Sequence, residues 1–167
     1  KSLDNLMKKA IERPADKKFI SLNHVQGLVE FRDVSFSYPE FQSKAVEDVS
    51  FKIRPGERVG VLGRIGSGKS TLGRLMTGLY EPTEGGILID GTELQQLDPG
   101  DVRRNIGYVT QDNFLFYGTV RENIAFGAPH VNDQSIKRAA KIAGVMDFLR
   151  QTTQGLDLQV GERGMAL

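Results

Sequence analysis

The sequence predicts an α/β fold in which a mixed sheet comes first and a helical segment follows. A short apolar run at 58–62 leads into a glycine-rich loop, and leucines at helical spacing follow that loop. Residues 29–38 and 49–53 carry apolar side chains at alternate positions, which is the period of a β-strand. From Thr119 onward, apolar periodicity and capping signals are typical of helices.

The glycine-rich loop is the most informative stretch of the chain. Residues 63–70 read GRIGSGKS and fit the pattern G-x-x-x-x-G-K-[ST]. Glycines let such a loop turn its backbone N–H groups toward phosphate oxygens, the lysine adds a positive charge at the β- and γ-phosphates, and the last hydroxyl ligates Mg²⁺. The predicted contacts to a nucleoside triphosphate are Gly63, Arg64, Ile65, Gly66, Ser67, Gly68, Lys69, Ser70 and Thr71.

Composition excludes several other classes of function. The chain has 167 residues and a formal net charge of +1, so nothing favours a nucleic-acid partner. It has no cysteine, which excludes disulfides and thiolate metal sites. His24 and His130 lie far apart, so we expect no histidine metal site. A glycine-rich turn that binds nothing remains the alternative reading of 63–70.

The pattern of the N-terminal residues predicts a helix followed by a linker. Residues 1–13 carry an apolar stripe, and Pro14 ends that pattern. Residues 15–26 are polar. We therefore predict three parts: an amphipathic helix and linker over 1–26, a core with an antiparallel β subdomain over 27–118, and the start of a helical subdomain over 119–167.

Several strands are expected within 27–118. The alternation changes phase near Asp33, which predicts a bulge in the first strand. Residues 85–90 form another expected strand, and 106–109 form a buried strand that leads to Gln111. Asp90 follows an apolar run, as a magnesium-binding aspartate would, but Gly91 follows it and favours a hairpin turn.

The predicted helices follow Gly118. Thr119 and Glu122 have the spacing of a capping box. A second helix is expected over 133–143 and is stopped by Gly144, and a third over 146–151.

Seven stretches resemble, in order, the motifs of one known family: 34–38, 63–71, 86–91, 108–112, 115–116, 119–124 and 160–164. Through them the chain is similar over 27–167 to the nucleotide-binding domain of ATP-binding cassette (ABC) exporters. That resemblance implies a P-loop NTPase of the ABC ATPase type that binds ATP and Mg²⁺.

The resemblance implies roles for further residues. Tyr38 would stack on adenine, where the alternative is an aromatic ring packed on the sheet. Gln111 would contact Mg²⁺ and the attacking water beside the catalytic Lys69 and the metal ligand Ser70, where the alternative is an ordinary polar strand end. Phe114, Leu115 and Phe116 would belong to the loop 111–116 that receives a covalently linked transmembrane domain, or would pack in the core.

The resemblance also implies an incomplete domain. The family continues with a signature motif, a magnesium-binding aspartate, a catalytic glutamate and a switch histidine, and we expect the chain to stop at 165–167 just before that signature. The implied partners are a second nucleotide-binding domain in a homodimer and the transmembrane domain. We expect the intact protein to hydrolyse ATP, and this chain to bind ATP weakly and hydrolyse it poorly.

A narrower group is suggested by two stretches. Residues 11–14 and 143–149 are similar to type I secretion exporters, which export proteins from Gram-negative bacteria with a membrane fusion protein and an outer-membrane channel. That resemblance implies the cytoplasmic face of the bacterial inner membrane. A lipid or drug exporter is the alternative within the family. Outside it, the alternatives are a P-loop kinase or GTPase, which the absence of an Asn-Lys-x-Asp motif opposes, and a non-catalytic interaction module with a vestigial nucleotide site.

Overall fold

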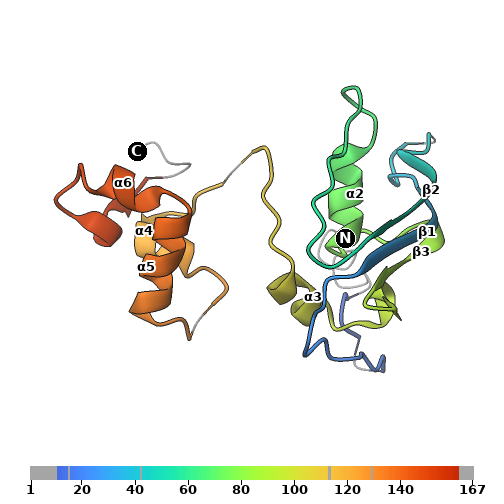
Figure 1. Ribbon diagram of the computed structural model, residues 1–167, viewed down its shortest axis with the longest axis horizontal. Helices are drawn as coiled ribbons and strands as arrows, with labels where there is room; N and C mark the ends of the chain where they lie inside the picture. The colour runs from blue at the N-terminus through green and yellow to red at the C-terminus, as the bar shows by residue number, and fades with distance from the viewer. Residues whose placement is uncertain (1–10, 15, 42, 113, 129, 162–167) are drawn as a thin grey trace, which may run out of the picture. The chain divides into compact units, whose positions relative to one another are not determined.

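The computed structural model describes residues 11–161 apart from 15, 42, 113 and 129 (Figure 1). The chain forms two compact units, Lys1–Tyr108 and Val109–Leu167. The expected amphipathic helix lies mostly outside the described residues, as do the stretch 162–164 and the chain end at 165–167. In the described part of the chain, no helix has the length and apolar character needed to cross a membrane.

The first unit is built on a four-stranded antiparallel sheet. Its strands are β1 (Val29–Phe36), β2 (Val46–Ile53), β3 (Glu84–Ile89) and β4 (Thr92–Glu93), in the order β2-β1-β3-β4. β1 pairs on one edge with β2 and on the other with β3. The strands predicted over 29–38, 49–53 and 85–90 are thereby confirmed, with small differences at their ends.

The predicted break in β1 is present at Asp33. This residue has a φ of 49°. The register shifts between Phe31 and Val34 in the pairing with β2, and between Arg32 and Ser35 in the pairing with β3. Because of this extra residue, the side chains on both sides of the bulge point into the core: Phe31 and Val34 are both buried, at 3% and 0% exposure.

Asp90 forms the predicted hairpin turn between β3 and β4. Asp90 and Gly91 have φ values of 51° and 83°, which a tight hairpin turn requires. The Asp90 carboxylate accepts hydrogen bonds from the N–H groups of Gln26, Gly27 and Leu28, at 2.8, 3.1 and 2.9 Å. Asp90 therefore fixes the chain at the start of β1, and the turn reading of this residue is confirmed.

The helix α2 (Lys69–Met76) covers one face of this sheet (Figure 1). Its apolar face has the predicted spacing, and Leu75 is fully buried. The core of the first unit combines this helix face with the inner face of the sheet and with the segment after β4. Its buried members are Phe31, Val34, Phe36, Val46, Leu75, Ile87, Ile89, Leu94, Leu97 and Val102.

A further helix, α3 (Pro99–Asn105), was not predicted. Asp98 caps its N-terminus by accepting hydrogen bonds from the N–H groups of Gly100 and Asp101, at 2.8 and 3.3 Å. Pro99 occupies the first helical turn, where its missing N–H costs nothing. The short 3₁₀ turn η1 (Leu94–Gln96) connects β4 to this helix.

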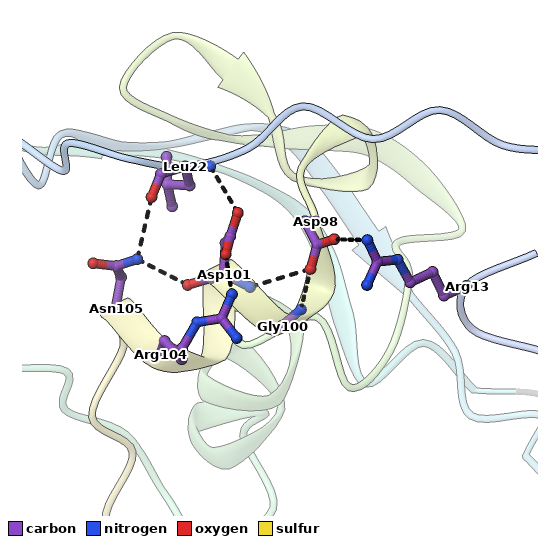
Figure 2. Close-up of polar contacts among 7 residues, drawn as sticks. All are labelled: Arg13, Leu22, Asp98, Gly100, Asp101, Arg104 and Asn105. Atoms are coloured by element: carbon purple, nitrogen blue, oxygen red, sulfur yellow. Dashed lines mark hydrogen bonds and ion pairs between the residues drawn. The ribbon is translucent and has the colours of Figure 1, made fainter. Parts of the chain in front are cut away.

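The polar segment before β1 is bound to α3 rather than free (Figure 2). Arg13 forms an ion pair with Asp98 at 2.8 Å, and the Leu22 N–H donates to the Asp101 carboxylate at 3.0 Å. Ile20 exchanges backbone hydrogen bonds with the chain at 96–98, at 2.7 and 2.9 Å. Asn105 completes this clasp by donating to the Leu22 carbonyl at 3.4 Å.

Two predicted strands are not formed. Residues 58–62 and 106–109 carry no strand pairing, and Leu62 and Val109 are 96% and 86% exposed instead of buried. A parallel strand is stable only where neighbouring strands complete its hydrogen bonds and both faces are covered. Among the described residues no strand lies beside either segment, so the expectation of buried strands there was wrong.

The second unit is a small helical body with one short strand pair. It contains β5 (Gly118–Thr119), α4 (Val120–Ile124), α5 (Asp133–Ile142), α6 (Val145–Leu149), η2 (Gly155–Asp157) and β6 (Gln159–Val160). The capping box of Thr119 with Glu122 and the stop at Gly144, with a φ of 75°, are confirmed. Its core residues are Val120, Ile136, Ala140, Leu149, Leu156 and Val160.

Candidate nucleotide site

The phosphate-loop candidates lie between the end of segment 58–62 and the first turn of α2. The chain bends sharply there, because Gly66 and Gly68 have φ values of 82° and 85°. Gly68 has a second constraint: a Cβ atom on it would lie 2.3 Å from the carbonyl oxygen of Ala45. Only glycine satisfies both conditions, so this residue fixes the loop closely against the start of β2.

Lys69 reaches back over the loop from the helix. Its Nζ donates hydrogen bonds to the carbonyl oxygens of Gly63 and Arg64, at 2.9 and 2.6 Å, and approaches Ser67 Oγ at 3.4 Å. The loop carbonyls thus hold a positive charge inside the curve of the loop. The N–H groups of the first helical turn also have no acceptor within the helix, which makes this end of α2 attractive to anions.

Ser70 and Thr71 have different surroundings. Ser70 is exposed, so its hydroxyl is accessible to a hard cation such as Mg²⁺. Thr71 is buried, at 6% exposure, and its Oγ1 lies 3.1 Å from the Tyr38 hydroxyl. The side chain of Thr71 therefore connects the phosphate loop to Tyr38, the predicted adenine platform.

The Tyr38 ring packs among other aromatic rings. It meets Phe36 and Tyr80 edge to face, with centroids 4.8 and 5.2 Å apart. Arg74 donates a hydrogen bond to the Tyr38 hydroxyl at 3.0 Å. Partial burial raises the pKa of Tyr38, but the hydrogen bonds with Thr71 and Arg74 outweigh this effect, so that the pKa is lowered overall.

Arg74 and Tyr80 were not predicted from the sequence, although the sequence carries one signal for Arg74. Arg74 follows Thr71 by three residues, which places the two side chains on the same face of α2. This spacing could have suggested that the shared helix face contacts the tyrosine at the end of the first strand. Tyr80 lies beyond the end of the helix, and nothing in its local sequence indicates a contact with Tyr38.

Gln111 belongs to the second unit, not to the unit that holds the loop. It is exposed there, next to a bend in which the Thr110 hydroxyl donates to the Asp112 carbonyl at 2.6 Å. The structure describes each unit by itself, so the approach of Gln111 to the metal and water stays a prediction.

The loop after Gln111 divides between core and surface. Leu115 packs against the core of the second unit, whereas Phe114 and Phe116 are 58% and 44% exposed. Phe116 stacks on Phe126, which is itself 66% exposed, with centroids 4.2 Å apart. Asn123 fixes this loop through hydrogen bonds with both backbone groups of Phe116, at 2.8 and 2.9 Å. The three phenylalanines form an exposed aromatic row on the second unit.

Protein ligands for a metal are sparse at the loop. Over the described residues, no group of three or more His, Cys, Asp or Glu side chains is arranged to hold a metal ion. A cation at Ser70 would therefore take most of its ligands from phosphate oxygens and water, which is how Mg²⁺ is commonly bound beside nucleotides.

Comparison with known proteins gives one consistent family. Residues 46–166 match the family model described as ABC transporter. The chain is 42% identical over 161 residues to an ATP-dependent lipid A-core flippase of Pseudomonas fluorescens, covering 94% of this chain and 26% of that protein. It is 40% identical over 148 residues to a leukotoxin translocation ATP-binding protein of Mannheimia glucosida, covering 89% of this chain and 21% of that protein.

A solved structure agrees with these relatives. A bacterial Atm1-family ABC exporter with ATP bound superposes with a TM-score of 0.88 at 34% identity, covering 99% of this chain and 29% of that chain. The chain thus spans about a quarter of the length of the proteins that it matches.

Proposed function

Because this chain belongs to the ABC transporter family, we propose that it is the ATP-binding motor domain of an exporter that couples ATP hydrolysis to transport. The observation that carries the proposal is the phosphate loop. Its lysine is already held inside the curve of the loop, and its glycine bend is fixed against β2. This arrangement positions charge and N–H donors before a ligand arrives.

The loop residues fit a magnesium nucleotide. Lys69 would lie against the β- and γ-phosphates, the loop and first-turn N–H groups would donate to phosphate oxygens, and Ser70 would ligate Mg²⁺. Bound Mg²⁺ supplies charge neutralisation on the phosphates during hydrolysis. Tyr38, which contacts the first turn of α2 through Thr71, would stack on the base, and Gln111 would position water and metal.

In the intact protein, two such domains would pair as a homodimer. The loop of one domain would face the signature motif of the other, and the cycle of closing and opening would drive a covalently linked transmembrane domain. The exposed aromatic row of the second unit supports a docking role for the loop 111–116, because such a patch is unusual on a free surface. This arrangement would place the chain at the cytoplasmic face of a bacterial inner membrane.

For the cargo, we favour a protein exported by type I secretion. The resemblance of residues 11–14 and 143–149 supports this choice, and the similarity to the leukotoxin translocation protein is consistent with it. A membrane fusion protein and an outer-membrane channel would then be further partners. The competing proposal is a lipid exporter, which the similarity to a lipid A-core flippase favours. Transport assays on the intact parent protein, one with a protein cargo and one with lipid A, would distinguish the two proposals.

Nucleotide binding is the direct test of the motor assignment. We expect the 167-residue chain to bind Mg-ATP in calorimetric titrations and to lose most of this affinity in Lys69→Ala. Lys52→Ala is the matched control, because Lys52 pairs with Glu30 at 3.2 Å on the sheet. A folded chain that binds no ATP at millimolar concentration would instead support a non-catalytic interaction module.

Hydrolysis tests a second part of the proposal. We expect the chain by itself to turn over ATP poorly and the intact parent to turn it over well. Substantial turnover by the chain, abolished in Lys69→Ala, would refute the expectation that it lacks essential groups.

A further inference from the structure

The Tyr38 hydroxyl is held by two polar side chains of one helix. Thr71 Oγ1 lies 3.1 Å from it, and the Arg74 guanidinium donates to it at 3.0 Å. Thr71 and Arg74 are three residues apart on α2 and therefore project from the same face. The hydroxyl end of the ring is thus attached to the helix that begins in the phosphate loop.

The direction of the hydrogen bonds makes Arg74 the organising group. A guanidinium can only donate, so the Tyr38 oxygen accepts from Arg74, and the Tyr38 proton is then available for Thr71 Oγ1. Each bond polarises the other in such a chain, which strengthens both. The lowered pKa of the Tyr38 hydroxyl is consistent with a guanidinium beside its oxygen.

The rest of the ring is restrained by packing. Phe36 and Tyr80 meet it at interplanar angles of 81° and 85°. The ring is only partly buried, so packing alone does not enclose it. The attachment of its hydroxyl therefore adds a restraint on its orientation beyond that of packing.

We propose that Arg74 is a positioning residue that holds the Tyr38 ring ready to stack on the purine base of a nucleotide. This inference rests on the proposed function, because it assumes that a nucleotide occupies the phosphate loop. Arg74 itself would touch neither the base nor the phosphates. It acts by fixing the Tyr38 side chain before the base binds, so that less conformational entropy is lost when the base stacks on it.

The test compares two probes that share a phosphate tail. Mg-ATP carries a base, and magnesium tripolyphosphate does not. In Arg74→Met we expect affinity for Mg-ATP to fall roughly two- to tenfold, the cost of ordering one side chain on binding. Affinity for tripolyphosphate should stay within twofold of wild type, on the order of the error of such a titration.

Three further variants keep the test sharp. Arg74→Lys retains a donor and should recover much of the ATP affinity. Tyr38→Phe removes the hydroxyl and should weaken ATP binding as Arg74→Met does, and the double variant should be no weaker than either. Arg32→Met is the control for lost charge, because Arg32 pairs with Glu30 at 3.0 Å on β1 and does not contact Tyr38.

Several results would overturn the inference. One is an ATP affinity in Arg74→Met equal to that of wild type. Another is an equal loss of affinity for ATP and for tripolyphosphate in Arg74→Met. A third is a loss of ATP affinity in the double variant equal to the product of the losses in the two single variants. A wild-type chain that binds tripolyphosphate and ATP equally would refute the base platform alone. A wild-type chain that binds neither probe would refute the proposed function itself, and this inference with it.

Discussion

Replacing Gly68 by alanine should disrupt the phosphate loop more than the same change at Gly66. Both residues have a positive φ, 85° and 82°, which costs an alanine roughly 1–2 kcal/mol. At Gly68 the new Cβ would also lie 2.3 Å from the Ala45 carbonyl oxygen, whereas nothing lies within 4 Å of a Cβ at Gly66. The backbone at Ala45 would have to move.

The difference between the two variants isolates that contact. Overpacking in a well-packed region costs about 1–3 kcal/mol, so we expect the free energy of unfolding to fall by about 2–5 kcal/mol in Gly68→Ala. In Gly66→Ala the expected loss is only about 1–2 kcal/mol, from the backbone conformation. Mg-ATP affinity should fall with the same ranking, since the bend at Gly68 directs the first turn of α2.

Urea unfolding followed by tyrosine fluorescence measures these losses. Three of the four tyrosines, Tyr38, Tyr80 and Tyr108, belong to the first unit, so the signal reports mainly on the unit that contains the loop. Equal losses of stability in the two variants would show that the loop does not lie against β2 as described. The reasoning from the Ala45 contact would then be refuted.

Other parts of the first unit give three more predictions. Asp98→Ala should lower its melting temperature, because losing a helix cap costs about 1 kcal/mol, whereas Asp98→Asn keeps an acceptor and should lower it less. The Leu22 N–H, and after it Arg104, lower the pKa of the Asp101 carboxyl below its ordinary 3.8. This contribution to stability is therefore present above that value and lost as pH falls through the folded-state pKa, which a carboxyl NMR titration should show. Leu62 and Ile65 are almost fully exposed, so light scattering should detect concentration-dependent self-association that a Leu62→Asp/Ile65→Asp variant reduces.

The fold class and the family could be predicted from the sequence because their signals are local. The loop 63–70, the bulge near Asp33 and the Asp90 turn each depend on a few adjacent residues, and all are found where expected. The resemblance to ABC exporters over 27–167 is confirmed by the family match and by the solved exporter. The unpredicted helix at Pro99–Asn105 also has a local signal, an Asp-Pro start.

The misplaced strands have a different cause. An apolar run such as 58–62 indicates that a segment is able to be buried, but pairing depends on neighbours distant in the sequence. The surroundings of Tyr38 are nonlocal in the same way. Arg74 and Tyr80 meet it only because α2 packs on the sheet that contains β1. The spacing of Thr71 and Arg74 indicates that they share a helix face, but not that Tyr38 lies opposite that face.

The attachment of Arg13–Leu22 to α3 has a mechanical consequence. A pulling force applied ahead of Arg13 would not first extend this stretch, because contacts with α3 hold it at both ends. The side chains that make these contacts are those of Asp98, Asp101 and Asn105. Force would be delivered to α3, whose last turn runs directly into the residues that lead to Gln111. The segment ahead of β1 is therefore attached to α3 at two points and is not a free tether.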